Sequence, residues 1–446
     1  MEHDRRVTRT WVLHPDIKSD KDRRAAKPAL EEAVALAAAL PDLDVVGKTL
    51  VPLPRPQPGR LFGSGKVDEL AQLFKANEIE LVMIDGPVTP VQQRNLEKDW
   101  NVKILDRTGL ILEIFSDRAA TREGVLQVEM AALSYQRTRL VRAWTHLERQ
   151  RGGLGFVGGP GETQIEADRR AIDEQLVRLK RQLEKVVKTR TLHRAARAKV
   201  PYPIVALVGY TNAGKSTIFN RLTGADVMAK DMLFATLDPT MRAVKLANGV
   251  DVILSDTVGF ISDLPTELVA AFRATLEEVL AANLILHVRD ISHAATEEQA
   301  GDVRTIMDSL GVSKDVTVID VWNKIDNMPD DDRTALENIS SRQENTIAVS
   351  AITGQGMEAL LETIAQSLGQ EKSIETLDVP FSDGKRRAWL YAQGIIVTED
   401  TTDDGTRFTV SWTPKQQYQF SKLILLLWCP RHQSNNISLA NFRAGA

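Results

Sequence analysis

The stretch Gly209-Tyr-Thr-Asn-Ala-Gly-Lys-Ser216 restricts the fold of this chain more than any other, because it fits the pattern G-x-x-x-x-G-K-[ST]. The apolar run Ile204–Val208 precedes it and Thr217–Leu222 follows, so the sequence predicts a buried strand, a glycine-rich turn and a helix. In such a unit, backbone N–H groups surround phosphate oxygens at the positive end of the helix. Lys215 would reach the β- and γ-phosphates, and the Ser216 hydroxyl would bind Mg²⁺. The pattern alone predicts a nucleoside triphosphate site and leaves the base open.

Composition is that of a globular protein of the cytoplasm. The 446 residues predict about three domains, and 43% hydrophobic with 26% charged residues is ordinary for this class. Cys429 is the only cysteine, which excludes a disulfide framework and a cysteine metal site and fits a reducing compartment. No apolar segment follows the charged first residues, so no secretory signal is expected. The apolar run Leu423–Cys429 is far shorter than the roughly 20 residues of a membrane span, so none is expected.

Residues 1–117 alternate between strand-like and helix-like segments, which predicts a small open α/β domain. Strands are expected at Val12–Leu13, Leu43–Val51, Leu81–Ile84 and Val102–Leu105, and helices at Ala29–Leu40, Lys66–Ala76 and Pro90–Trp100.

Within this domain, Gly63-Ser-Gly-Lys66 resembles the end of a phosphate loop. Arg60 stands where the first glycine should be, and Val67 replaces the hydroxyl that would bind Mg²⁺. A helix N-terminus is therefore the favoured interpretation. The alternative is a second nucleotide site in an ATP-driven RNA-remodelling enzyme, which would require ATPase activity that survives Lys215→Ala but not Lys66→Ala.

Residues 118–200 carry two narrow apolar stripes with steps of three and four residues, which predict two long helices packed side by side. Between the stripes, Gly152–Gly161 has six glycines in ten residues, more than a turn needs, which favours an insertion loop over a plain hairpin tip. The first stripe is Leu126, Met130, Leu133, Leu140, Trp144 and Leu147, broken at Arg137, and the second is Ile172, Leu176, Leu179, Leu183 and Val186.

The same segment is strongly basic. Residues 118–199 hold 18 Lys and Arg against 9 Asp and Glu, although the whole chain has a net charge of −4. A solvated helical face is the ordinary interpretation, but an excess of one sign on a protruding element also matches an RNA-backbone binder. Aromatic residues are few here, so structured RNA recognised by shape and phosphate fits better than base reading. The candidate RNA contacts are Gly158, Gly159, Pro160, Gly161, Arg169 and Arg170.

Residues 201–370 predict a doubly wound α/β domain, with strands at 204–208, 242–246, 251–255, 284–289, 316–322 and 346–350. Three more motifs follow the phosphate loop in order, each at a strand end. In Asp256-Thr-Val-Gly259, the aspartate would hold Mg²⁺ through water and the Gly259 N–H would contact the γ-phosphate.

The other two motifs predict the base. Asn323-Lys-Ile-Asp326 would select guanine, because the Asp326 carboxylate can accept from both N1–H and the 2-amino group. Adenine would leave that carboxylate unpaired, at about 1–3 kcal/mol for each lost partner. Ser350-Ala-Ile352 would offer a backbone N–H to guanine O6. Four ordered motifs at strand ends therefore predict a guanine-nucleotide site.

With these motifs and the loop Gly159-Pro-Gly-Glu-Thr-Gln164, the chain resembles the HflX family of translational GTPases over residues 8–370. Asp106-Arg-Thr-Gly-Leu-Ile111 and Thr145-His-Leu-Glu-Arg149 also match family segments. Phe234-Ala-Thr-Leu-Asp-Pro-Thr240 resembles the family's switch I, which implies that Thr236 closes on Mg²⁺ and the γ-phosphate. The residues alone do not choose Thr236 over Thr240.

The expected site follows from the motifs and the resemblance together. Residues expected to act in hydrolysis are Lys215, Thr236, Asp256 and Gly259, and direct Mg²⁺ ligands are Ser216 and Thr236. Expected nucleotide contacts are Gly209, Tyr210, Thr211, Asn212, Ala213, Gly214, Lys215, Ser216, Thr217, Phe234, Ala235, Thr236, Leu237, Asp238, Asp256, Thr257, Val258, Gly259, Asn323, Lys324, Ile325, Asp326, Ser350, Ala351 and Ile352.

Phe260 stands where signalling GTPases carry the glutamine that orients the attacking water. A phenyl ring cannot do this by hydrogen bonding, so hydrolysis by the chain alone should be slow, and a partner can supply roughly 10³–10⁵-fold. The resemblance implies that the ribosome is that partner. Asn212 resembles the asparagine that some related GTPases use to hold K⁺, with a loop-stabilising asparagine as the open alternative.

The resemblance implies a GTPase that binds the large ribosomal subunit and its rRNA and directs the glycine-rich tip toward the peptidyl-transferase centre. With GTP bound it would split stalled or idle ribosomes, and hydrolysis to GDP would release it. The alternative is a GTP-gated RNA-binding or assembly factor acting on large-subunit precursors. A monomer is expected.

Residues 371–446 predict a small α+β domain, with a helix at Ala388–Gln393 and strands at Gly394–Val397 and Arg407–Trp412. The end of the chain, from Leu423, resembles no known ending of the family and is expected to be a disordered tail. Deletion of residues 430–446 should leave thermal stability and nucleotide binding unchanged.

Overall fold

The computed structural model describes residues 7–20, 23–150, 160–197, 202–225, 233–237, 239–246, 249–263, 277–368, 373–402, 404–412, 416–417 and 420–421. For residues 140–150, 160–165, 189–197 and 277 it describes the backbone only. The chain divides into two compact units, Met1–Arg197 with Tyr202–Leu368 and Ala198–Pro201 with Gly369–Ala446. Within the described ranges, no helix is long and apolar enough to cross a membrane.

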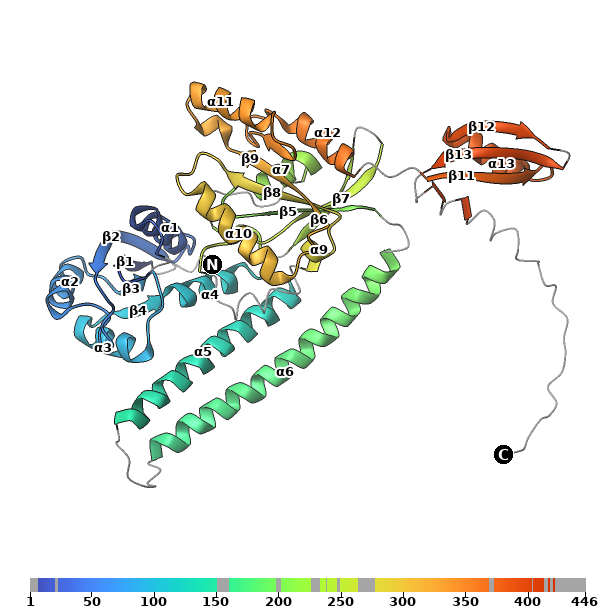
Figure 1. Cartoon of the computed structure of the whole chain (residues 1–446). Coiled ribbons are helices and arrows are strands. Elements are labelled where there is room, and N and C mark those ends of the chain that lie inside the picture. Colours follow the sequence, from blue (N-terminus) through green and yellow to red (C-terminus); the bar gives the residue numbers. More distant parts are fainter. Residues whose placement is uncertain are drawn as a thin grey trace, which may run out of the picture. The chain divides into compact units, whose positions relative to one another are not determined.

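The first unit begins with a four-stranded parallel sheet in the order β2-β1-β3-β4 (Figure 1). Val12 and Leu13 are both fully buried, because successive residues of a strand point to opposite faces and both faces are covered. The elements are β1 (Thr8–Ile17), α1 (Ala26–Ala38), β2 (Leu43–Leu53), α2 (Ser64–Ala76), β3 (Leu81–Ile84), α3 (Pro90–Trp100) and β4 (Lys103–Asp106).

The segment that resembles a phosphate-loop end begins α2, as the favoured interpretation predicted. Gly63 is the N-cap residue of this helix, and Val67 packs into the core. The Lys66 ammonium pairs with Glu69 one turn further on, at 2.7 Å. This lysine therefore acts as an ordinary surface residue of a helix.

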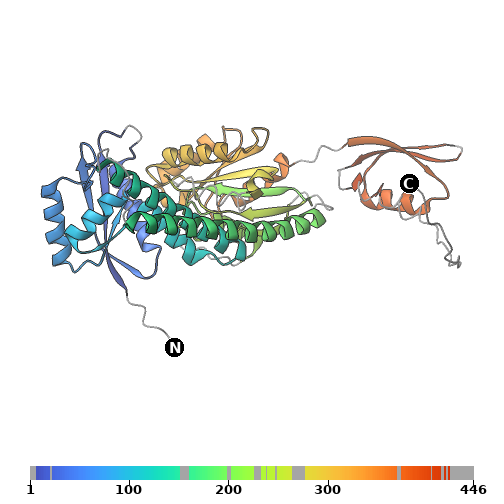
Figure 2. The same cartoon turned by 90° about the horizontal axis from the view of Figure 1, so that it is seen from below.

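Three helices follow the sheet: α4 (Arg107–Arg118), α5 (Arg122–Gln150) and α6 (Pro160–Arg197). Both views show α5 and α6 side by side, as the apolar stripes predicted (Figures 1 and 2). Arg137, the break in the first stripe, is exposed and pairs with Asp173 of α6 at 3.2 Å. The expected loop ends earlier than predicted, because Pro160 begins the helix, where a proline's missing N–H is no loss. Residues 151–159 lie outside the described part.

The domain predicted for residues 201–370, called the G domain here, contains a six-stranded sheet in the order β10-β9-β8-β5-β7-β6, in which only β6 is antiparallel to its neighbour. The predicted doubly wound α/β fold is therefore present. Its strands are β5 (Ile204–Gly209), β6 (Thr240–Lys245), β7 (Asp251–Asp256), β8 (Leu284–Asp290), β9 (Thr317–Asn323) and β10 (Thr346–Ala348), and its helices include α7 (Lys215–Thr223), α9 (Glu277–Leu280), α10 (Thr296–Leu310), α11 (Asp330–Ser340) and α12 (Met357–Ser367).

One continuous apolar core, called the shared core here, joins the parts of the first unit. Its members come from the N-terminal sheet, from α4 and α5, and from the loops beside the phosphate site. They include Val12, Met83, Phe115, Val128, Ala131, Tyr210, Phe234, Val258, Phe260 and Ile261. The opposite face of the N-terminal sheet has its own core with α2 and α3, around Leu13, Phe74 and Trp100.

The second unit is a small antiparallel sheet in the order β11-β13-β12, with α13 against one face. Its elements are β11 (Ser373–Pro380), α13 (Gly384–Gln393), β12 (Ile396–Thr401) and β13 (Gly405–Trp412). Leu390, Phe408 and Trp412 form its core together with Phe420. The sequence did not predict β11, because only Val379 of this strand is buried and its side chains show no apolar alternation.

Candidate nucleotide site

The phosphate loop turns sharply between β5 and α7, and two of its glycines are required for space. A Cβ atom on Gly209 would lie 2.2 Å from the carbonyl oxygen of Val288 on the neighbouring strand. A Cβ atom on Gly214 would lie 2.2 Å from Asn323 Nδ2, at a residue whose φ is +94°. Both distances are far below van der Waals contact, so any side chain would displace the loop from the strands that shape it.

Lys215 is buried at the first turn of α7, with its ammonium folded back over the loop. Its Nζ donates to the carbonyl oxygens of Gly209 at 3.1 Å and Tyr210 at 2.8 Å. Burial lowers the pKa of Lys215 to about 8, although the nearby Asp256 carboxylate opposes the shift. Phosphate oxygens would add negative charge here and favour the ammonium form.

Three side-chain oxygens converge beside Lys215. Ser216 Oγ lies 2.7 Å from Asp256 Oδ2, and Thr236 Oγ1 lies 2.9 Å from the same oxygen and 2.8 Å from Ser216 Oγ. The other Asp256 oxygen, Oδ1, is buried and has no hydrogen-bond partner among the described residues. Burial raises the pKa of Asp256, which the hydrogen bond from Ser216 partly offsets. Hard oxygen donors around an unsatisfied carboxylate fit Mg²⁺.

The structure separates the two threonines of the switch I segment. Thr236 is buried against Ser216 and Asp256, whereas Thr240 begins β6 and pairs with Asp256 through the strand backbone. Phe234, two residues before Thr236, has a left-handed backbone (φ 56°). Its ring packs edge-on against that of Phe115 of α4, with the ring centroids 4.7 Å apart. Leu237 is also buried, and Asp238 lies outside the described residues.

Two hydrogen bonds of Asn323 connect the motifs predicted to bind the base with the phosphate loop. Its Nδ2 donates to the Ala213 carbonyl at 2.8 Å, and its Oδ1 accepts from the Ala351 N–H at 3.0 Å. Asp326 Oδ1 is buried and has no hydrogen-bond partner within the described part of the chain. Ser350 and Ala351 are buried beside it, whereas Ile352 is 70% exposed. Lys324 pairs at 2.9 Å with Asp290, a carboxylate at the end of β8 that the sequence motifs did not predict.

The segment 256–261, called switch II here, is joined to the phosphate loop by backbone hydrogen bonds of Phe260. The Thr211 N–H donates to the Phe260 carbonyl at 2.7 Å, and the Phe260 N–H donates to the Gly209 carbonyl at 3.1 Å. The Phe260 ring is 1% exposed and belongs to the shared core. A Cβ atom on Gly259 would lie 2.8 Å from the Thr211 side chain and 3.1 Å from Lys215 Nζ. Glycine is therefore required where the loop and switch II approach most closely.

Most of the predicted phosphate contacts lie around a single cavity. Their side chains and backbone surround one cavity next to the loop, lined by Thr211, Asn212, Gly214, Lys215, Ser216, Thr217, Phe234, Ala235, Thr236, Thr257 and Gly259. Val258 and Ile325 are instead buried in the core.

Comparison with known proteins decides the family. Four family models match successive parts of the chain: GTP-binding GTPase N-terminal (27–116), GTP-binding GTPase middle region (118–197), 50S ribosome-binding GTPase (204–324) and HflX C-terminal domain (335–424). The GTPase HflX of Magnetococcus marinus is 50% identical over 403 residues, covering 90% of this chain and 91% of the relative. The chain belongs to the HflX GTPase family.

Other proteins are also similar to this chain. The GTPase HflX of Escherichia coli is 44% identical over 351 residues, covering 79% of this chain and 82% of the relative. A solved GTP-binding protein from Sulfolobus solfataricus, in complex with GDP, is 24% identical with a TM-score of 0.43, covering 81% of this chain and 98% of that one. This HflX family member is thus a GTPase with a P-loop domain that binds GTP and GDP.

Proposed function

We propose that this HflX family member binds the large ribosomal subunit with GTP bound and splits stalled or idle ribosomes into subunits. The family model that matches residues 204–324 describes a 50S ribosome-binding GTPase, which supports the partner. The observation that carries the proposal is the shared core. It joins Val128 and Ala131 of the hairpin helix α5 to Phe234 and Phe260 of the switches, so the nucleotide loops and the hairpin cannot repack independently.

Helix α6 is the proposed rRNA surface, through its lysines and arginines. Its described lysines and arginines are all exposed, so they are available to phosphate oxygens. They are Arg169, Arg170, Arg178, Lys180, Arg181, Lys185 and Lys188. Pro160 and Gly161, at the start of this helix, would follow the tip into the subunit, and Gly158 and Gly159 lie outside the described residues.

In the proposed hydrolysis, Lys215 stabilises charge on the β- and γ-phosphates. Ser216 and Thr236 would hold Mg²⁺, which neutralises phosphate charge when bound, and Asp256 would hold it through water. The Gly259 N–H would contact the γ-phosphate, and Asp326 would select guanine. The Phe260 ring lies in the core, so the residue at the position of the glutamine does not orient the attacking water. Slow turnover that the ribosome accelerates is therefore expected.

Two roles remain for Asn212, a K⁺ ligand or an amide that stabilises the loop, and its left-handed backbone (φ 59°) suits asparagine in either. GTP turnover in KCl and in NaCl separates them. Turnover several-fold faster in KCl, with the difference lost in Asn212→Ala, would support K⁺. Equal rates in the two salts would exclude it.

Sedimentation of intact ribosomes with the protein and GTP, a non-hydrolysable analogue or GDP tests the function. Free subunits should accumulate with GTP and with the analogue but not with GDP. Arg178→Glu/Arg181→Glu should abolish splitting without changing nucleotide affinity, whereas the control Lys75→Glu/Lys314→Glu, at exposed sites elsewhere, should split normally. Binding only to large-subunit precursors, with intact ribosomes unaffected, would instead identify an assembly factor.

A further inference from the structure

The N-terminal sheet has a crevice where open parallel sheets bind ligands. Such ligands lie outside the carboxyl ends of the strands, where the strand order reverses, which here is between β1 and β3. Leu13 pairs with Ile84, so the next residues, His14 and Asp85, lie together at this edge, with Nδ1 and Oδ2 2.7 Å apart. Arg107, the first residue after β4, donates to the other Asp85 oxygen at 2.7 Å.

The G domain's own chain fills this crevice. Arg107 donates to the backbone carbonyl of Ser262 at 2.9 Å, and Arg24 Nε lies 3.3 Å from an Asp263 carboxylate oxygen. Ser262 follows switch II directly, two residues after Phe260. Arg107 is 3% exposed and Ser262 is 6% exposed, so their contact is closed to water. The crevice thus receives a peptide segment in place of a small ligand.

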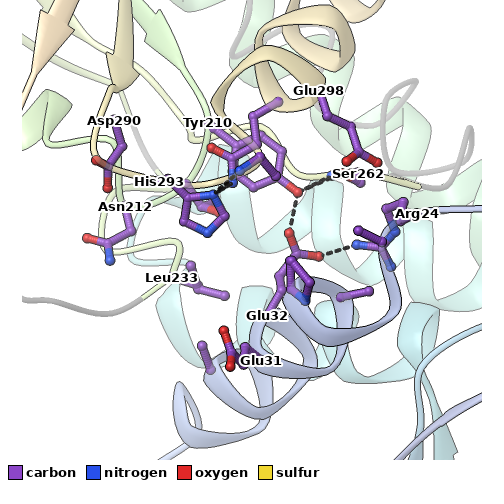
Figure 3. Close-up of a pocket in the computed structure, with 17 residues that line it drawn as sticks. Arg24, Glu31, Glu32, Tyr210, Asn212, Leu233, Ser262, Asp290, His293 and Glu298 are labelled. Carbon is purple, nitrogen blue, oxygen red and sulfur yellow. Dashed lines mark hydrogen bonds and ion pairs between the residues drawn. The ribbon is translucent and has the colours of Figure 1, made fainter. Parts of the chain in front are cut away.

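A second connection runs through Glu32 of α1 to the phosphate loop. Figure 3 shows Glu32 reaching both Arg24 and the hydroxyl of Tyr210. Arg107 Nη2 also donates to Glu32 at 2.5 Å. The Tyr210 hydroxyl lies 2.7 Å from Ser262 Oγ and accepts from the Ser262 N–H at 2.8 Å. Tyr210 is the second residue of the phosphate loop, and its carbonyl accepts from Lys215, so Glu32 is connected to the phosphate site.

These groups form what is called the interdomain clamp here: Arg107, Glu32, Tyr210 and Ser262. Arg24 and Arg107 supply two positive charges, and Asp85 and Glu32 supply two negative ones, so the buried network is balanced. Beside it lies a cavity of about 200 Å³ that extends to Asn212 of the phosphate loop (Figure 3). A rearrangement of switch II that withdrew Ser262 would remove one hydrogen-bond partner from Arg107 and would free the Tyr210 hydroxyl from Ser262, leaving Glu32 as its remaining partner in the clamp.

The clamp is formed while switch I is in the arrangement that a triphosphate requires, with Thr236 beside Ser216 and Asp256. We propose that the interdomain clamp makes the N-terminal domain a sensor of the γ-phosphate: Arg107 and Glu32 are positioning residues that stabilise the GTP arrangement of switch II over the GDP arrangement. A ligand changes a two-state equilibrium only through its different affinity for the two states, and the coupling is reciprocal. Loss of the clamp must therefore lower GTP affinity more than GDP affinity.

Binding of fluorescent GDP and of a fluorescent non-hydrolysable GTP analogue, by equilibrium titration of the full chain with Mg²⁺, tests this proposal. Glu32→Gln, which keeps the side-chain shape, and Arg107→Lys, which keeps the charge but loses the planar fork, should each raise the Kd of the analogue roughly 10-fold, within the usual 5- to 150-fold range of such couplings. The Kd of GDP should change by less than about 2-fold.

Tyr210→Phe completes a double-mutant cycle. Because Glu32 and Tyr210 share one hydrogen bond, the double variant should raise the analogue Kd no further than the larger single change. Trp100→Phe is the matched stability control: Trp100 is buried in the other core of the same domain and donates to the Val67 carbonyl at 3.0 Å. It should lower the melting temperature and leave the ratio of the two Kd values unchanged. The proposal would be overturned if the clamp variants raised both Kd values equally or raised neither. It would also be overturned if Trp100→Phe changed the ratio of the two Kd values as much as Arg107→Lys does.

Discussion

Asn323→Ala should uncouple the base site from the phosphate loop. The side chain bridges the Ala213 carbonyl at 2.8 Å and the Ala351 N–H at 3.0 Å, and it is 1% exposed. Its removal leaves two buried backbone groups unpaired, at about 1–3 kcal/mol each. If about 2 kcal/mol of this total is lost from the binding free energy, the affinities for GTP and GDP should both fall roughly 30-fold.

Isothermal titration calorimetry with GDP, GTP analogue and ATP measures the effect. The preference for GTP over ATP should persist, because Asp326 and not Asn323 meets the guanine edge in the proposed site. Asn95→Ala is the control: it removes one comparable bond, to the Gly59 carbonyl at 2.9 Å, within the N-terminal domain. An Asn323→Ala protein that binds guanine nucleotides as tightly as the Asn95→Ala protein would refute the bridging role.

Three further predictions follow from single contacts. Thr236→Ala should weaken the Mg²⁺ dependence of GTP-analogue binding, seen in a Mg²⁺ titration. Thr240→Ala should not, since of the two threonine hydroxyls only that of Thr236 bonds to the Ser216 and Asp256 side chains. Phe260→Gln should not speed hydrolysis in a phosphate-release assay and should lower stability by about 2–5 kcal/mol in urea, because the ring is buried in the shared core; faster turnover would show that the side chain can leave the core. Burial would raise the pKa of Asp85, but the hydrogen bond from His14 and the charge of Arg107 hold it below its ordinary 3.8. Ionised Asp85 therefore stabilises the fold fully at a pH above 3.8, and this stabilisation is lost as the pH falls below that value. The difference in melting temperature between wild type and Asp85→Asn should thus be large at neutral pH and shrink below about pH 4.

The G domain could be predicted because its functional residues follow strand ends in a fixed order. The phosphate loop, Asp256 and Asn323 each lie at or directly after the end of a short apolar run, and such runs form the buried parallel strands whose carboxyl ends meet at one edge. Choosing between Thr236 and Thr240 required the family resemblance, because both are hydroxyls in one loop. The structure distinguishes them by burial and by hydrogen bonds to Ser216 and Asp256.

The interdomain clamp could not be predicted in the same way. Arg107 and Ser262 are 155 residues apart, and nothing in either segment indicates the other. Asp106-Arg-Thr-Gly-Leu-Ile111 resembles a family segment, but its sequence pattern predicts neither the helix α4 nor a contact with the G domain. The strand ends of the N-terminal sheet were a usable signal, since Asp85 and Arg107 stand where a ligand would be sought. The occupant is a loop of another domain, which local patterns do not identify.

The shared core changes the meaning of a common experiment. A G domain expressed without the first 117 residues would keep its nucleotide motifs, but the side chains beneath both switches, Phe234 and Phe260 among them, would lose apolar neighbours such as Phe115 and meet water. A changed rate of GTP turnover in such a fragment would then have two causes that cannot be separated: the newly exposed hydrophobic surface and the loss of regulation by the N-terminal domain. Point substitutions at the domain boundary, which leave that surface covered, are the sounder route to the contribution of the N-terminal half.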